Sequence, residues 1–163
     1  MTELQDTQLN SHESDSRREI RHSITRYLAQ REHGFNEIMQ KLLAKSYDSH
    51  LCQEELIKFR DADLQSDQRF AESFMQRRID KGYGERYVQA EAASKGLDAD
   101  MISVVLEELA VDWQALAYTT AEHKFGEQPP ATPKEHQKRH RFLLNRGFSA
   151  HQVLAVYPYQ DFD

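Results

Sequence analysis

The chain has few of the residues that form disulfides or tight turns, namely cysteine, glycine and proline. Cys52 is its single cysteine, which excludes an internal disulfide framework and is typical of a reducing compartment. Only six glycines and four prolines occur, so a turn-rich β architecture is not indicated. The sequence contains no run of about 18 apolar residues, which excludes a membrane-spanning helix. Its first residues also lack the basic start and apolar middle of a signal peptide, so we expect a cytoplasmic protein.

The composition is polar for a protein with a single compact core. Charged residues make up 29% and apolar residues 39% of the chain, and the mean hydropathy is −0.81. Such values are ordinary for an array in which each unit buries only one face. The formal net charge of −6 argues against simple nucleic-acid binding. Residues 1–16 are polar and carry a net charge of −4, and we expect a disordered acidic tail there.

A four-residue phrase recurs about every fifty residues. The three copies are Lys45-Ser46-Tyr47-Asp48, Lys95-Gly96-Leu97-Asp98 and Arg146-Gly147-Phe148-Ser149. In each copy a basic residue suits the end of one helix, and Gly96 or Gly147 suits the left-handed position just beyond it. The aspartate or serine that follows suits the N-cap of the next helix. A helix stop joined to a helix start, at a fixed period, predicts a repeat protein.

Apolar residues at helical spacing between these phrases predict three helices in each unit and no strand. We therefore expect an all-α fold of three tandem three-helix repeats that form an elongated, curved array. The predicted boundaries are a tail at residues 1–16 and repeats at residues 17–64, 65–111 and 112–163. The last repeat differs, because an acidic helix does not follow its phrase. A monomer is the expected state.

Catalytic and metal-binding motifs are weak in this sequence. His136 and His140 have the i, i+4 spacing of a zinc-ligand pair, but they lack a third ligand and lie among cations. Cys52 is expected to be a small core residue without a local activator. The adjacent pair Glu54-Glu55 and the scattered histidines, such as His33, are interpreted as solvated surface groups. We predict no catalytic residue, no metal and no cofactor.

Basic side chains gather in three clusters at equivalent positions of the repeats, and an acidic helix follows the first two. The clusters comprise Arg17, Arg18, Arg21 and Arg31; Arg77, Arg78, Lys81 and Arg86; and Lys134, Lys138, Arg139, Arg141 and Arg146. Any one cluster is ordinary for a helix surface. Because equivalent positions of stacked repeats form one stripe, three clusters predict a basic surface for a polyanion. The acidic helices offer a second surface, for a basic protein partner.

Several segments, in order, resemble the bacterial RecX regulatory proteins over roughly residues 17–157. They are the segments 27–33 (YLAQREH), 41–48 (KLLAKSYD), 67–74 (DQRFAESF), 78–84 (RIDKGYG) and 141–148 (RFLLNRGF). The chain departs from the family pattern at Ser46, where glycine is usual, and in the alanine-rich segment 90–93.

The resemblance implies a non-enzymatic modulator that binds the RecA filament on single-stranded DNA and restrains its recombinase, ATPase and co-protease activities. We predict the contact residues from the charge pattern alone. They are Arg21, Arg31, Arg77, Arg78, Lys81, Arg86, Lys138, Arg139, Arg141 and Arg146. Two alternatives stay open, namely a helical nucleic-acid-binding module that acts without RecA and a helical scaffold with no role on DNA. The sequence does not decide which face meets RecA and which meets DNA.

Overall fold

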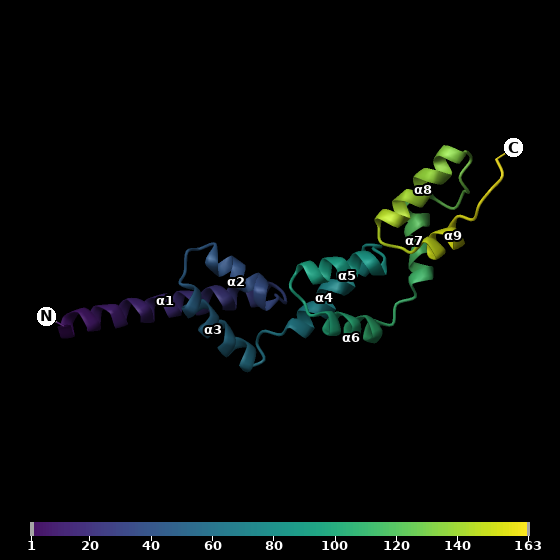
Figure 1. The fold of residues 1–163 in the computed structure, drawn as a ribbon. Helices are drawn as coiled ribbons and strands as arrows, with labels where there is room; N and C mark the ends of the chain where they lie inside the picture. Colours follow the sequence, from purple (N-terminus) through teal and green to yellow (C-terminus); the bar gives the residue numbers. More distant parts are fainter. Residues whose placement is uncertain (1, 163) are drawn as a thin grey trace. The chain divides into compact units, whose positions relative to one another are not determined.

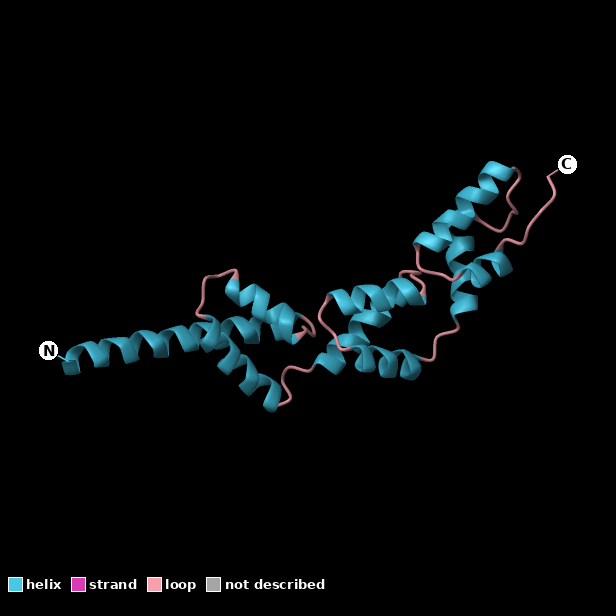
Figure 2. Cartoon of the chain, viewed as in Figure 1, coloured by secondary structure: helices cyan, strands magenta, loops and turns pink. Residues whose placement is uncertain are grey.

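The structure is a computed structural model that describes residues 2–162, with side chains from Asn10 onward. Over these residues the chain consists of nine α-helices and no strand, which confirms the predicted all-α repeat fold. The helices are labelled in Figure 1, and Figure 2 colours the chain by secondary structure. None of the described helices is long and apolar enough to cross a bilayer. The chain divides into two compact units, Met1–Phe70 and Ala71–Asp163, and the division falls inside one helix.

The first unit contains the helices α1 (Thr2–Gln30), α2 (Phe35–Leu43) and α3 (Ser49–Asp61) and the beginning of α4 (Asp67–Asp80). Helices α1 and α3 pack together, and α2 packs on both of them. Their shared core consists of Ile20, Ile24, Ile38, Leu42, Cys52 and Leu56, each fully buried. Cys52 is thus the core residue that its spacing predicted.

The prediction of a disordered tail over residues 1–16 is wrong for the part that the structure describes. Helix α1 begins at Thr2, whereas Met1 lies outside the described residues. An ion pair one turn apart supports this stretch, because Arg17 Nη2 lies 2.8 Å from a Glu13 carboxylate oxygen. Arg18 similarly lies 3.4 Å from Asp15. Acidic residues near the start of a helix also interact favourably with the positive pole of the helix dipole.

The second unit holds the rest of α4 and five further helices: α5 (Glu85–Ser94), α6 (Ala99–Leu109), α7 (Trp113–Phe125), α8 (Pro133–Asn145) and α9 (Ala150–Val156). Val88 and Ala92 are the buried positions of α5, as their spacing predicts. The last three helices enclose a core of Ala117, Ala121, Leu143, Phe148, Val153 and Tyr157.

All three copies of the repeated phrase adopt the predicted helix stop and helix start. Ser46, Gly96 and Gly147 have the left-handed φ values of 63°, 80° and 94°. Asp48, Asp98 and Ser149 each accept a hydrogen bond from a backbone N–H in the first turn of the following helix. Leu97 and Phe148 fold back into the interior, where they are buried. The phrase therefore fixes where six of the helices begin or end.

Within the second unit, backbone contact at two glycines joins the second helix triplet (α4, α5 and α6) to the third (α7, α8 and α9). The amide of Gly84 donates to the carbonyl oxygen of Arg146 at 2.7 Å, and the amide of Arg86 donates to Gly147 at 3.2 Å. A Cβ atom placed on Gly84 would lie 2.5 Å from the backbone of Gly147, so only glycine fits there. We call this contact the glycine joint.

His33 lies in the interior of the first unit, so the prediction of a solvated surface residue is wrong for it. Its Nδ1 lies 3.0 Å from the carbonyl oxygen of Arg31, and its Nε2 lies 2.9 Å from Lys41 Nζ. Burial is the main cause that lowers the pKa of His33, with further help from the nearby cations Arg31 and Lys41. The imidazole is therefore kept neutral, with Lys41 as donor to Nε2.

Candidate functional site

The predicted contact arginines of the first unit form ion pairs with acidic side chains of the same unit. Glu55 has no exposed surface and receives hydrogen bonds from Arg17, Arg21 and Lys58. Burial alone would raise the pKa of Glu55, but these three cations outweigh it and hold the pKa below the ordinary range. Glu55 is therefore not the solvated residue that the sequence predicts. Arg31 is likewise paired with Glu37.

The second basic cluster comprises Arg77, Arg78, Lys81 and Arg86. One of these cations is ion-paired, and the other three are exposed. Arg78 reaches α5, where Nη2 lies 2.6 Å from the Glu91 carboxylate, and its guanidinium lies 5.3 Å from the Phe74 ring centre. Arg77 is exposed, and within the described residues its guanidinium donates to the neighbouring hydroxyl of Ser73 and forms no ion pair. Lys81 and Arg86 are exposed, and neither side chain forms an ion pair within the described part of the chain. These three cations keep an exposed charge, whereas Arg78 joins α4 to α5.

Arg139 is a structural residue. Its side chain is buried, pairs with Glu135, and donates to the carbonyl oxygen of Gln128 at 2.7 Å. The guanidinium also lies over the rings of Phe125 and Tyr157. A partner cannot reach this group, so we remove it from the predicted contact residues. Nothing in the sequence signals this role, because Arg139 has the same spacing as its exposed neighbours.

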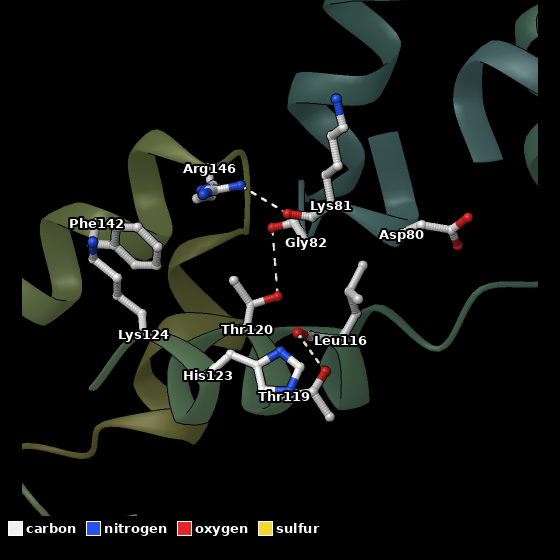
Figure 3. A pocket seen from close by; sticks show the side chains of 10 residues that line it. All are labelled: Asp80, Lys81, Gly82, Leu116, Thr119, Thr120, His123, Lys124, Phe142 and Arg146. Atoms are coloured by element: carbon white, nitrogen blue, oxygen red, sulfur yellow. Dashed lines mark hydrogen bonds between the residues drawn. The ribbon is translucent and has the colours of Figure 1, made fainter. Parts of the chain in front are cut away.

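Arg146 borders a hollow of about 260 Å³ between the second and third helix triplets (Figure 3). Its Nη1 donates to the carbonyl oxygen of Lys81 at 2.9 Å, and its guanidinium lies 4.4 Å from the Tyr83 ring centre. Lys124 also lines the hollow, and its Nζ lies 5.8 Å from the centre of the Phe142 ring (Figure 3). Lys124 was not predicted from the sequence, because it stands outside the three basic clusters. Asp80 also lines the hollow, so the walls of the hollow carry both acidic and basic side chains.

The outer surface of α8 carries the densest group of free cations. Lys134, Lys138 and Arg141 are exposed and follow one another at spacings of four and three residues, so they share a helix face. Together with Phe142 and two amide side chains they line a shallow groove of about 520 Å³. We name the α8 strip by its five polar members: Lys134, Gln137, Lys138, Arg141 and Asn145.

The α8 strip has no acidic residue of its own. The single acidic residue of α8 is Glu135, which does not line the groove and is bound to Arg139 and to the backbone amide of Ala131. The Ala131 hydrogen bond is the main cause that lowers the pKa of Glu135, and the Arg139 pair adds to it. Glu135 also interacts with Lys138, but the strip keeps a net positive charge, and such a surface attracts a polyanion.

The histidine pair of α8 is hydrogen-bonded to the segment that follows α9. His136 Nε2 lies 2.9 Å from the carbonyl oxygen of Pro158, and His140 Nε2 lies 2.7 Å from that of Tyr157. Each Nε2 therefore carries a proton, which it donates to the carbonyl. Among the described residues, no group of three or more side chains is suited to a metal ion.

The single cysteine of the chain is not placed as a reactive thiol. Cys52 is fully buried, and burial is the main cause that raises the pKa of its thiol, so the reactive thiolate is disfavoured. The fold is therefore that of an all-α helical-repeat protein, and the second unit of this protein has exposed cations on its surface.

Comparison with known proteins identifies the group to which this repeat protein belongs. Two family models match, described as the second three-helix domain of RecX over residues 66–106 and the third over residues 111–157. "Regulatory protein RecX" of Halorhodospira halophila is 35% identical over 144 residues, which cover 88% of this chain and 89% of that protein. The protein of the same name from Legionella pneumophila is 35% identical, over 83% of this chain and 90% of that protein. The chain belongs to the RecX family.

Solved structures agree with this fold. The crystal structure of RecX from Lactobacillus salivarius superposes with a TM-score of 0.71 at 20% identity, over 88% of this chain and 95% of that chain. A second crystal structure, of a regulatory protein RecX, gives a TM-score of 0.75 at 20% identity, over 93% of this chain and 76% of that chain. At this identity the likeness establishes the helical-repeat fold alone.

Proposed function

We propose that this protein is a regulator that binds the RecA filament on single-stranded DNA and restrains its recombinase, ATPase and co-protease activities. The observation that carries the proposal is membership of a family whose members are named regulatory proteins, over most of their length. The free cations of the second unit supply a surface for such a partner. A cytoplasmic location, a monomeric state and a role without catalysis belong to the same proposal.

The contact residues we propose are the predicted cations that keep an exposed charge. They are Arg77, Lys81, Arg86, Lys138 and Arg141, together with Lys134 of the α8 strip. Arg21 and Arg31 stay in the proposal as secondary candidates, since both are exposed even though they are paired with acids. Arg146 is a further secondary candidate, because its guanidinium borders an open hollow.

The test is ATP hydrolysis by RecA on single-stranded DNA, measured with and without this protein. We expect inhibition at amounts of protein well below the amount of RecA, because an agent that blocks filament growth acts at few sites. Unchanged hydrolysis at amounts equal to RecA would contradict the proposal. A matched measurement with prior filament assembly separates blocked growth from disassembly.

One observation favours a second candidate, a nucleic-acid-binding module that acts without RecA. The α8 strip concentrates free positive charge in a chain whose net charge is −6. Such a module would bind DNA in the absence of RecA with a steep dependence on salt. It would also leave RecA hydrolysis unchanged when DNA is in large excess, which distinguishes it from the filament regulator.

A further inference from the structure

A hollow of about 540 Å³ lies between α8 and the segment that follows α9. Tyr159 and Phe162 of this segment form one wall. The histidine pair fixes that wall, since His136 and His140 donate to the backbone carbonyls of Pro158 and Tyr157. The Phe162 ring also lies 5.7 Å from the His136 ring, at an interplanar angle of 73°. We call this feature the C-terminal hollow.

The aromatic wall is unusually open to solvent. The Tyr159 side chain belongs to a residue that is 84% exposed, the highest value among the described large apolar residues that lie at the surface. Leu144 on the facing helix is also 45% exposed. An exposed aromatic ring beside other apolar surface is a common mark of a binding site, since its burial on binding is favourable.

The C-terminal hollow and the α8 strip share one edge. Gln137, Arg141 and Asn145 line both of them. On one side of this edge stand the free ammonium groups of Lys134 and Lys138, and on the other stand the aromatic rings. The edge itself offers amide groups, which both donate and accept hydrogen bonds. The site therefore combines positive charge, polar amides and flat apolar surface, in that order across α8.

We propose that this surface is a binding site for single-stranded nucleic acid. Its phosphates would lie along the cations of the α8 strip, and an unpaired base would enter the C-terminal hollow and stack on Tyr159 or Phe162. Asparagine and glutamine amides pair readily with the polar edges of bases. The proposal rests on the proposed function, since it names how this chain touches the DNA on which RecA assembles, but the binding itself needs no RecA.

Two features favour a single strand over other partners. In a duplex the faces of the bases are stacked on one another and are not available to an aromatic side chain, whereas an unpaired base offers its face. A protein partner usually meets an apolar centre surrounded by a polar rim, and here the aromatic wall lies to one side of a row of cations. Asp161 of the same segment is exposed to solvent and does not line the hollow.

The experiment measures binding by fluorescence anisotropy at low salt, without RecA. Three labelled ligands of equal length are compared: oligothymidylate, the same backbone with abasic sites, and a duplex. We expect oligothymidylate to bind more tightly than either of the others. The abasic strand reports the phosphate backbone, and its difference from oligothymidylate reports the bases. Inorganic pyrophosphate as competitor distinguishes a strand from an isolated phosphate group.

Tyr159→Ala is the decisive variant, because an 84% exposed side chain contributes little to the fold. We expect it to weaken binding of oligothymidylate roughly fivefold or more, since stacking on one base contributes on that order, and to leave the abasic strand unaffected. Tyr159→Phe keeps the ring and should bind like the unaltered protein. Circular dichroism verifies that each variant keeps its helices.

The phosphate contacts are tested by the double variant Lys138→Gln with Arg141→Gln. It should weaken oligothymidylate and the abasic strand alike and flatten the dependence on salt. Lys95→Gln is the matched control, because Lys95 is exposed in the same unit but lies outside both surfaces. Equal affinity for abasic and base-bearing strands, or tighter binding of the duplex, would overturn the proposal even if RecA hydrolysis is inhibited. Base-dependent binding without that inhibition would instead overturn the proposed function.

Discussion

At the scale of single residues, the left-handed position beyond each helix stop shows how one side chain alters local stability. Gly96 and Gly147 occupy this position in two copies of the repeated phrase, and Ser46 occupies it in the first with a φ of 63°. A residue with a Cβ atom in the left-handed region loses roughly 1–2 kcal/mol relative to glycine. The first unit therefore contains a small strain that the other two copies of the phrase avoid.

We predict that Ser46→Gly stabilises the first unit by about 0.5–1 kcal/mol. Relief of the strained φ outweighs the extra freedom that glycine gives to the unfolded chain. The Ser46 side chain is exposed, so no packing is lost. The measurement is the free energy of unfolding from urea titration, followed by circular dichroism.

Ser103→Gly provides the control for this prediction. Ser103 is exposed within helix α6, where glycine costs about 0.5–1 kcal/mol relative to a better helix former. The two substitutions are chemically identical, but Ser46→Gly should raise the free energy of unfolding and Ser103→Gly should lower it. A loss of stability in Ser46→Gly would show that the strain at this φ is smaller than the added freedom of the unfolded chain.

At the scale of helices, the glycine joint determines how the second and third triplets meet. The amides of Gly84 and Arg86 at the start of α5 would lack partners in an isolated helix. They donate instead to the carbonyl oxygens of Arg146 and Gly147 beyond the end of α8. The joint thus satisfies two of the free donors at the start of α5 with two carbonyl oxygens at the end of α8, and it ties these helices together within the second unit.

We predict that Gly84→Ala destabilises the second unit by about 1–3 kcal/mol and loosens this joint. The added methyl group would lie 2.5 Å from the backbone of Gly147, which cannot move as a flexible side chain can. Hydrogen exchange of the Arg86 amide should become faster, since its acceptor moves away. Gly126→Ala is the contrast, because nothing lies within 4 Å of that position, although its φ of 76° strains any residue with a Cβ atom. It should lower stability through this local strain but leave exchange at Arg86 unchanged, and equal acceleration of that exchange by both substitutions would refute the role of the joint.

At the scale of the whole molecule, the sequence predicted the repeats well and the charged surface only in part. The repeated phrase is local, since caps and left-handed residues act within a few positions, and all three copies fold as predicted. Glu55 and Arg139 were predicted wrongly because their partners or their burial depend on tertiary packing. Arg17 and Glu55, for example, lie 38 positions apart in the chain.

The two units consequently differ in how they use their basic residues. In the first unit, arginines of α1 neutralise acids of α3, so alternating charge along the sequence becomes internal pairing. In the second unit, Arg78 and Arg139 stabilise the fold, whereas Arg77 and the α8 strip keep free charge. A charge pattern in the sequence does not distinguish these uses, because both require the same residue types at the same helical spacing. A partner-binding role is therefore best tested at cations that have no structural partner.

We predict that Arg77→Glu weakens inhibition of RecA and leaves the fold intact. Arg77 is exposed and donates to Ser73, and reversal of its charge disturbs no ion pair in the part of the chain that the structure describes. The protein concentration needed for half-inhibition of RecA hydrolysis should rise roughly three- to tenfold, as for an exposed interfacial charge. Arg78→Glu is a poorer probe, because it would place two carboxylates together at Glu91 and destabilise the unit. Lys95→Glu makes the same change of charge elsewhere in the second unit and should leave inhibition unaltered. Equal effects of Arg77→Glu and Lys95→Glu would indicate a response to net charge rather than a contact at Arg77.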